Sequence, residues 1–354
     1  MRRSCVEFGP QSRQNAELSG GSKSVTSFKN LVGHKYTDFV VQKEHGWLPC
    51  ALRQLPKDRI GILVDGGDCR TVSPEEVTAM LLVKLRELAK DKMETGKVTD
   101  CVIAVPCFWT DTQRRALLDA TKTAPDLNCL LLLNETTATA LSYGMSSKRD
   151  LPPVGEKPQY VVFLDIGHSA TQAALVAFNR GKLSVLGTAW DMELGGRELD
   201  GLLRQHFRKE FLQKYKVDAA AAPRPWQRLL NECEELKKLM CANSVPIRFS
   251  IDSFMEDKDV NGRMQRADFE ELSANLWQKL DAVLQRLLTD TGFKPADVDV
   301  VEMVGGGSLM PRVRESVRRV LGKEARTTLM NRAAVSRGCA LQCAMLSRVR
   351  TGPF

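Results

Sequence analysis

Predicted strands and helices alternate along the middle of the chain, and this order restricts the folds open to it. Cys101–Val105 has the apolar character of a buried strand, residues 111–123 suit a helix, and Leu130–Leu133 is a second strand. A helix of small residues then begins at Glu135. Strands that alternate with helices in this way are joined by crossovers above a parallel sheet. We therefore expect an α/β fold.

The segment before this pattern predicts a hairpin followed by a well-capped helix. Residues 59–73 contain two apolar runs separated by a glycine-rich turn. Ser73 is a favourable N-cap, and Glu76 completes a capping box with it. The apolar positions of Pro74–Lys92 follow helical spacing, so a helix is expected there.

The second half of the chain begins with a strand at Tyr160–Ile166 and continues with a hairpin over residues 172–190. Three antiparallel strands are therefore expected before the next helices. The remaining predicted elements are helices at about 197–215 and 224–242, a strand at 245–251, a polar hairpin-like stretch at 255–264, a long helix at about 266–289, a strand at 298–304, and helices from Pro311 and Ala333.

Composition shifts divide the chain into two parts. Residues 1–24 are polar and without periodicity, so an irregular start is expected. Residues 146–159 are rich in Ser, Lys, Pro and Gly, which is typical of a linker. We expect a first lobe at 25–155 and a second at 156–350, with an outer subdomain at about 195–273.

Charge and hydropathy argue against two classes of partner. The 354 residues carry a net charge of +8, but Lys and Arg are spread along helices and mixed with Glu and Asp. Nucleic-acid binding needs clustered basic charge, so it is not expected. No apolar run reaches the roughly 18 residues of a membrane span, and no signal peptide follows Met1. No membrane association is expected.

The ten cysteines indicate a reducing compartment. None forms a Cys-x-x-Cys pair, and several stand in apolar runs. Buried reduced thiols are typical of the cytosol or nucleus. Cys339 and Cys343 are four residues apart on one helical face, where core packing is favoured over metal binding.

Two glycine loops follow predicted strands and could approach a phosphate. Asp165 ends one strand and Gly167 follows it, an arrangement in which the carboxylate orders a magnesium-bound water. The alternative is the plain start of a hairpin. The strand at 298–304 ends in Gly305-Gly306-Gly307-Ser308, which permits close backbone contact, or is simply a tight turn. Neither loop has Rossmann or P-loop spacing.

Together with other stretches, these loops make the chain resemble the seventy-kilodalton heat-shock chaperones. The matching stretches are Phe28–Gly33, Val105–Asp111, Leu133–Ala138, Asp165–Ala170, Leu194–Gly196, Glu232–Met240, Val304–Ser308 and Gly338–Ala344. The resemblance is collinear from about residue 24 to 346. Asp165-Ile-Gly-His-Ser-Ala and residues 254–259 are similar to the larger, 110-kDa branch.

This resemblance implies an actin-like ATPase fold with two lobes, each a mixed β-sheet flanked by helices, and a nucleotide cleft between them. It implies ATP or ADP and Mg²⁺ as ligands. Lys29 would hold the attacking water, and Glu135 and Asp165 would bind magnesium through water; these three are the candidate catalytic residues. Pro106 and Arg114 would relay the nucleotide state to the surface.

The resemblance also assigns the nucleotide contacts. Gly167, His168 and Ser169 match the second phosphate loop, and Gly195 and Gly196 a ribose-side contact. The adenosine contacts would be Glu234, Lys237, Lys238, Cys241, Gly305, Gly306, Gly307 and Leu309. From the residues alone, Lys237 and Lys238 suit a solvated helix face, and His168 a loop residue that binds nothing.

The sequence departs from the family pattern at several places. Nothing before residue 24 resembles the family's first strand and Asp-x-Gly phosphate loop, so the first lobe is expected to be incomplete. Leu309 replaces an arginine that stacks on adenine, Arg332 replaces an Asp, and Cys241 replaces a Ser. No substrate-binding domain is expected up to Phe354.

The function implied is that of an ATP-binding chaperone or co-chaperone in protein folding, acting as a nucleotide exchange factor. Its partners would be the nucleotide domains of ordinary heat-shock 70 chaperones, and unfolded clients. A weak ATPase at best is expected, because a missing phosphate loop removes electrostatic stabilisation. The alternatives are a truncated, non-catalytic remnant that only binds partners and a sugar-kinase-like ATPase of the same fold. The expected compartment is the cytosol or nucleus.

Overall fold

The computed structural model describes residues 24–64, 70–93, 98–147, 150–329 and 333–347. The chain forms two compact units. Unit 1 comprises residues 1–103, 109–132 and 222–228, and unit 2 comprises 104–108, 133–221 and 229–354. The lobe limits predicted from the linker, 25–155 and 156–350, stay predictions.

Unit 1 contains a three-stranded antiparallel sheet in the order β1-β2-β3. Its strands are β1 (Leu52–Leu55), β2 (Arg59–Val64) and β3 (Arg70–Val72). Antiparallel pairing of β2 with β3 confirms the predicted hairpin, whose turn lies outside the described residues. The sheet packs its apolar side chains with those of η1 (Phe28–Leu31) and α2 (Phe39–Glu44). Sequence patterns predicted neither β1 nor α2.

Side-chain caps begin the two main helices of unit 1. In α3 (Pro74–Lys90), the Glu76 amide donates to Ser73 Oγ at 3.1 Å and the Ser73 amide donates to Glu76 Oε2 at 2.7 Å. The predicted capping box is confirmed. Thr110 and Gln113 form an equivalent box at the start of α4 (Asp111–Thr123). This helix joins β4 (Asp100–Val105) to its neighbour β5 (Asn128–Asn134), as the alternating pattern predicts.

A five-stranded mixed sheet forms the core of unit 2. Its order is β12-β11-β6-β7-β8. The strands are β6 (Gln159–Ile166), β7 (Thr171–Asn179), β8 (Lys182–Asp191), β11 (Val300–Val304) and β12 (Ala325–Arg326). The β6-β7-β8 part is antiparallel, which confirms the three predicted strands. In contrast, β11 runs parallel to both β6 and β12.

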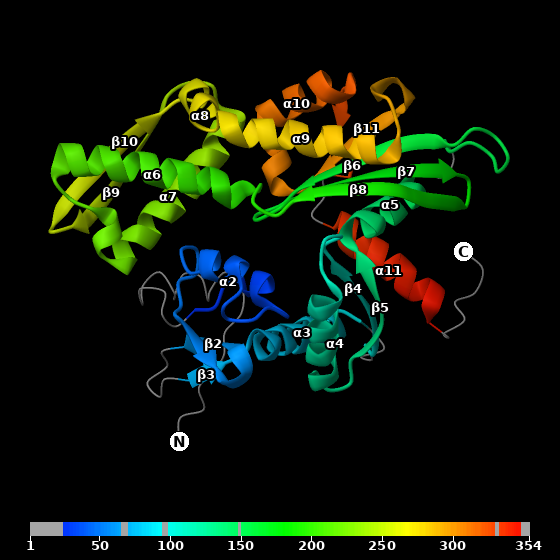
Figure 1. Cartoon of the computed structure of the whole chain (residues 1–354), viewed down its shortest axis with the longest axis horizontal. Coiled ribbons are helices and arrows are strands. Elements are labelled where there is room, and N and C mark those ends of the chain that lie inside the picture. The colour runs from blue at the N-terminus through cyan, green and yellow to red at the C-terminus, as the bar shows by residue number, and fades with distance from the viewer. Residues whose placement is uncertain (1–23, 65–69, 94–97, 148–149, 330–332, 348–354) are drawn as a thin grey trace. The chain divides into compact units, whose positions relative to one another are not determined.

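Helices cover both faces of this sheet (Figure 1). The helix α9 (Ala274–Thr291) lies against β7 and β8, and α5 (Glu135–Ser146) covers the opposite face. Outside α5 lies α11 (Ala334–Leu346). A Cβ at Gly338 would lie 1.8 Å from the Ala138 carbonyl oxygen, so α11 can approach α5 this closely only with glycine there.

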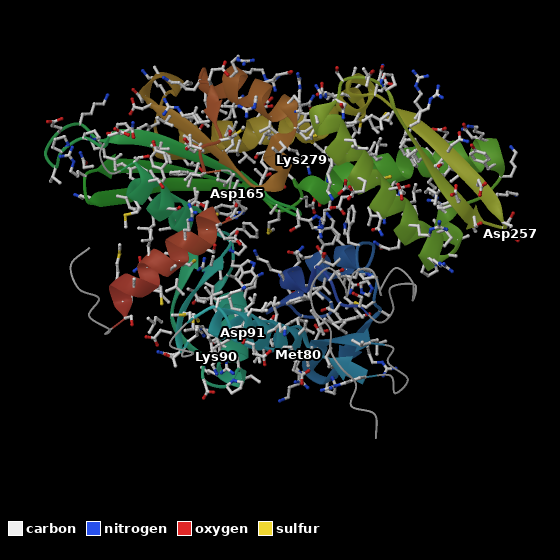
Figure 2. All side chains as sticks on the ribbon, turned by 180° about the vertical axis from the view of Figure 1, so that it is seen from behind. Met80, Lys90, Asp91, Asp165, Asp257 and Lys279 are labelled. Carbon is white, nitrogen blue, oxygen red and sulfur yellow. The ribbon has the colours of Figure 1, made fainter. Side chains whose placement is uncertain are left out.

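An outer part of unit 2 extends beyond the sheet. It contains α6 (Gly196–Tyr215), most of α7 (Pro223–Ala242), the hairpin β9 (Ile247–Met255) with β10 (Lys258–Met264), and α8 (Arg266–Leu272). Glu256 and Asp257 both have positive φ, 53° and 54°, as a type I′ turn requires. Figure 2 labels Asp257 in this turn. The predicted strand and hairpin-like stretch are therefore one antiparallel hairpin.

The predicted single helix at 266–289 is wrong, because the chain breaks at Ser273 into α8 and α9. Ser273 has φ −99° and ψ 13°, and its buried hydroxyl donates to the Phe269 carbonyl at 2.6 Å. Trp277 Nε1 donates to the same hydroxyl at 2.9 Å. Apolar spacing continues on both sides of Ser273, so the pattern does not show the break.

The remaining elements are one helix and several short 3-10 turns. They are α10 (Pro311–Leu321), η2 (Pro56–Asp58), η3 (Ala219–Ala221), η4 (Pro295–Asp297) and η5 (Gly306–Leu309). Within the described ranges, no helix combines the length and apolar character needed to cross a membrane.

Candidate functional site

The loops that follow β6 and β11 lie against each other in unit 2. These strands are parallel neighbours, and Asp165 is paired with Val304, so both loops leave the same sheet edge. Gly305 has φ +84°, and a Cβ there would lie 2.3 Å from the Ile166 carbonyl oxygen and 2.5 Å from Asp165 Oδ1. The two loops are therefore in close contact, and only glycine fits at position 305. Asp165 is labelled in Figure 2.

The loop after Asp165 is also held by the start of α6. The Gly196 amide donates to the Gly167 carbonyl at 3.0 Å, and the Arg197 amide donates to the His168 carbonyl at 2.8 Å. A Cβ at Gly195 would lie 2.4 Å from the His168 carbonyl oxygen. The predicted phosphate loop at Gly167 and the Gly195–Gly196 pair therefore form one packed backbone unit. The His168 side chain is exposed, and Ser169 follows it in the same loop.

Lys237 reaches this backbone unit from α7. Its Nζ donates to the Gly196 carbonyl at 2.8 Å and lies 2.7 Å from the Asp200 carboxylate. The two side chains are only 12% and 3% exposed, so the solvated-face interpretation is wrong for Lys237. Burial raises the pKa of Asp200 to about 6, and the Lys237 cation opposes this rise. Asp200 was missed, although it lies one turn after Gly196 on α6.

Lys238 differs from Lys237 because it is half-exposed. Its Nζ lies 2.9 Å from Glu234 Oε1 and 2.7 Å from Glu235 Oε1 on the same helix. Partial burial is the largest single effect on the pKa of Lys238 and lowers it. The ion pairs with Glu234 and Glu235 together outweigh burial, so the pKa of Lys238 is raised. The surface interpretation of Lys238 therefore fits its surroundings.

The end of α7 lies beside the glycine loop of β11. Cys241 Sγ is 3.2 Å from Met310 Sδ, just after η5, and burial raises the pKa of this thiol. Arg266 Nε donates to the Met240 carbonyl at 2.8 Å and so caps α7. Leu309, which stands in place of the stacking arginine, is 56% exposed. Gly306 and Gly307 complete this loop, and Gly306 has open space where a Cβ would be.

Glu135 is connected to β7, the strand paired with that of Asp165, by a glutamine that sequence analysis did not select. Glu135 is the first residue of α5, and Gln172 Nε2 donates to its Oε2 at 2.6 Å. Gln172 Oε1 accepts from the Cys107 amide at 2.7 Å, immediately after Pro106. In the β6–β7 register Gln172 is opposite Asp165. The sequence held one signal for Gln172, because it is a polar residue within an otherwise apolar predicted strand.

Two further candidate residues lie in unit 1. Lys29 is exposed on η1, and Arg114 on α4 donates from Nε to the Trp109 carbonyl at 3.0 Å. Their roles toward water and toward Pro106 stay predictions. Arg332 lies outside the described residues.

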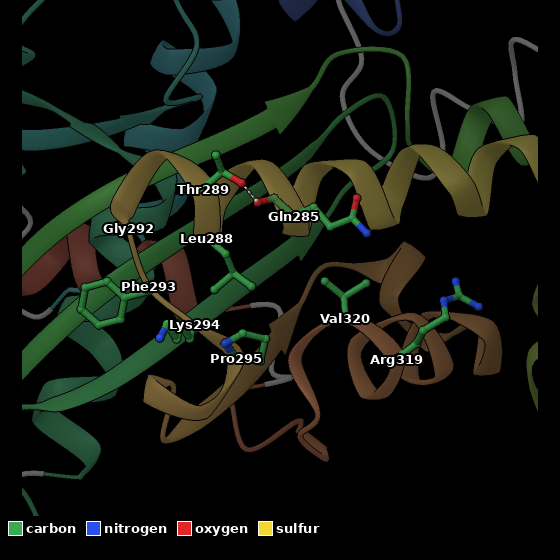
Figure 3. A pocket seen from close by; sticks show the side chains of 9 residues that line it. All are labelled: Gln285, Leu288, Thr289, Gly292, Phe293, Lys294, Pro295, Arg319 and Val320. Atoms are coloured by element: carbon green, nitrogen blue, oxygen red, sulfur yellow. Dashed lines mark hydrogen bonds between the residues drawn. The ribbon is translucent and has the colours of Figure 1, made fainter.

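No cluster of three or more His, Cys, Asp or Glu side chains in the described ranges has the arrangement of a metal site. A separate pocket of about 550 Å³ lies at the end of α9 (Figure 3). Its lining residues are Gln285, Leu288, Thr289, Gly292, Phe293, Lys294, Pro295, Arg319 and Val320. None of the predicted site residues is among them.

Comparison with known proteins matches the sequence of this chain to one family. The family described as Hsp70 protein matches residues 4–352. The chain is 49% identical over 352 residues to "Heat shock protein 110" of Caenorhabditis elegans, covering 97% of this chain and 45% of that protein. It is 46% identical over 350 residues to human "Heat shock 70 kDa protein 4", covering 97% and 41% respectively.

A third relative is the "97 kDa heat shock protein" of Strongylocentrotus purpuratus, 43% identical over 97% of this chain and 39% of that protein. The chain belongs to the Hsp70 family and, within it, to the Hsp110 branch. Its fold is accordingly the actin-like ATPase fold. It spans less than half the length of the curated relatives it matches.

The match corrects one expectation. It begins at residue 4, whereas the resemblance was expected to begin at about residue 24. Residues 1–24 contain no Asp and no local motif of the family, so a resemblance based on motifs does not extend to them. Their structure, except for that of Ser24, lies outside the described residues.

Proposed function

We propose that unit 2 of this chain binds an adenine nucleotide at the edge where β6, β11, α6 and α7 meet. The observation that carries this proposal is the contact between the Asp165 and Gly305 loops, together with the Gly195–Gly196 backbone unit. Glycine at these places has no side chain to obstruct the close approach of a phosphate or the edge of a base to the backbone. The Hsp70 family match supports the same assignment.

Asp165 and Glu135 would hold a magnesium ion through water beside the phosphates. Both are carboxylates, the ligand type that Mg²⁺ prefers. Gln172 bonds to Glu135 and is paired with Asp165 in the β6–β7 register, so the two carboxylates belong to one neighbourhood. The ion would neutralise phosphate charge. Lys237 is occupied by Asp200 and Gly196, so its role would be to fix the ribose-side backbone.

Binding should be weak and hydrolysis slow. Leu309 offers no cation or planar group to stack on a base, and Cys241 is a poorer hydrogen-bond donor than a serine. Competition against a fluorescent ATP analogue, with and without Mg²⁺, tests this. We expect ATP and ADP to compete better than GTP and to require Mg²⁺; equal competition by all three would contradict an adenosine site.

We further propose that the protein acts in protein folding with ordinary heat-shock 70 chaperones, as an exchange factor for their adenine nucleotide and in contact with unfolded clients. The names of its relatives, heat shock proteins of the larger branch, support this role over that of a sugar kinase. The cytosol or nucleus is the proposed compartment.

Stopped-flow release of labelled ADP from an ordinary heat-shock 70 chaperone tests the exchange role. Interfaces between folded partners bury on the order of 1,600 Å². The 354 residues correspond to 41–45% of the length of two relatives, so we expect only slight acceleration by this chain. Strong acceleration would show that these residues suffice. No binding at all would contradict the proposed partnership.

A further inference from the structure

Gln172 is nearly buried, 4% exposed, and bonds both of its amide ends. Its Nε2 donates to Glu135 Oε2 at 2.6 Å, and its Oε1 accepts from the Cys107 amide at 2.7 Å. The backbone N–H can only donate, and a carboxylate can only accept. The orientation of the Gln172 amide is therefore fixed by its two partners.

We propose that Gln172 is the positioning residue for Glu135: it directs this carboxylate toward the magnesium side of the nucleotide and joins it to the turn at Pro106–Cys107. This inference rests on the proposed nucleotide site. At this position the side chain must donate at one end and accept at the other. Glutamine does both without charge, whereas glutamate repels Glu135 and an aliphatic side chain satisfies neither partner.

The surroundings make charge at position 172 unfavourable. Within unit 2, Asp165 is opposite Gln172 on β6, Trp190 is opposite it on β8, and Glu135 faces it from α5. A second carboxylate here would stand near two others, so one of the group would bind a proton more readily.

Two variants separate this contact from general loss of packing. Gln172→Glu keeps the size and adds charge, and Gln172→Met keeps the size and removes both polar ends. Gln113→Glu is the control for an added buried carboxylate, because Gln113 accepts from Thr110 at a helix N-terminus and its Nε2 lies 3.2 Å from His34 Nε2, and both surroundings favour a carboxylate. Thermal unfolding is measured from pH 8 to pH 5.

We expect Gln172→Glu to lower the Tm by several degrees at pH 8 and to recover as pH falls, since a shared proton lets one carboxyl donate to the other. Gln172→Met should lower the Tm equally at both pH values, and Gln113→Glu should not lower it at either pH. A Gln172→Glu variant that follows the wild-type Tm throughout the pH range, or that does not recover at low pH, would overturn the proposal.

The double variant Gln172→Glu, Glu135→Gln exchanges the two groups and provides the decisive comparison. One amide and one carboxylate are again present, so the Tm should return most of the way to wild type at pH 8. Mg²⁺-dependent ATP affinity should remain lowered at least about tenfold, because the carboxylate now lies on the wrong strand. A swap no more stable than Gln172→Glu would contradict the contact, and full recovery of affinity would contradict the positioning role.

The two readouts also separate this inference from the proposed function. If the wild-type chain binds no ATP but the Tm series behaves as expected, the nucleotide site fails and the Gln172–Glu135 contact stands. If the wild type binds ATP and Gln172→Glu binds it with unchanged affinity at pH 8, the positioning role fails and the nucleotide site stands.

Discussion

Single residues decide how the loops of unit 2 are held, and several of them are buried polar groups. Lys237 neutralises Asp200 beneath the Gly196 carbonyl, and Gln172 connects Glu135 with Cys107. Each of these contacts joins residues of two different elements. A local sequence motif therefore contains only one of the two partners. Sequence reasoning therefore selected Lys237 and Glu135 but missed Asp200 and Gln172.

The buried Asp200 should give a measurable pH dependence of stability. Its pKa is about 6 in the folded protein, against an ordinary value of 3.8, so the folded state binds its proton more tightly. The group therefore contributes stability below about pH 4 that is lost as pH rises through 6. Relative to Asp200→Asn, the wild-type free energy of unfolding should fall by about 3 kcal/mol over this window. Urea unfolding measures this; parallel pH profiles would contradict it.

Cys129 on β5 should be the more reactive of two neighbouring thiols. A hydrogen bond with Cys101 on β4 lowers its pKa to about 7, against the opposing effect of burial. We expect iodoacetamide labelling of Cys129, followed by mass spectrometry, to reach half its maximal rate at a pH of about 7. Cys101→Ala should move this midpoint upward, whereas Cys101→Ser keeps a donor and should move it less. An unchanged midpoint in Cys101→Ala would exclude the hydrogen bond as the cause.

At the scale of elements, local patterns predicted most of what was found. The capping box of α3, the β2–β3 hairpin and the strands β6 to β8 follow from residues close together in the chain. The break at Ser273 and the strand β1 do not show in those patterns. Such boundaries depend on hydrogen bonds of single side chains and on pairing with a neighbouring strand. The periodicity of apolar residues carries no information about either.

The Ser273 break should be costly to alter. Ser273→Ala leaves the Trp277 N–H without its buried acceptor, which should lower the free energy of unfolding by about 1–3 kcal/mol. Ser336→Ala is the control, because Ser336 makes a similar bond to Ala333 at an exposed position, where changes are usually within about 0.5 kcal/mol. Equal effects of the two substitutions in urea unfolding would show that burial of Ser273 does not matter.

At the scale of the whole molecule, the pairing of β6 with β11 is the feature that creates the candidate site. Parallel pairing brings Asp165 and Gly305 to one sheet edge although they are far apart in the sequence. The alternating strand and helix pattern predicted a parallel sheet but not which strands are neighbours. The resemblance to the Hsp70 family supplied the candidate residues of the site, and the structure shows the strand pairing that brings Asp165 and Gly305 together.

Calorimetric titration of the full chain with ATP and Mg²⁺ tests the nucleotide site most directly, using two adjacent glycines. Gly305→Ala places a Cβ 2.3 Å from the Ile166 carbonyl oxygen at φ +84°, whereas Gly306→Ala meets nothing within 4 Å. We predict weak, saturable binding in the wild type, similar stability and a modest change in affinity for Gly306→Ala, and loss of binding in Gly305→Ala. Binding in Gly305→Ala equal to the wild type, or no binding by the wild type, would contradict the proposed site.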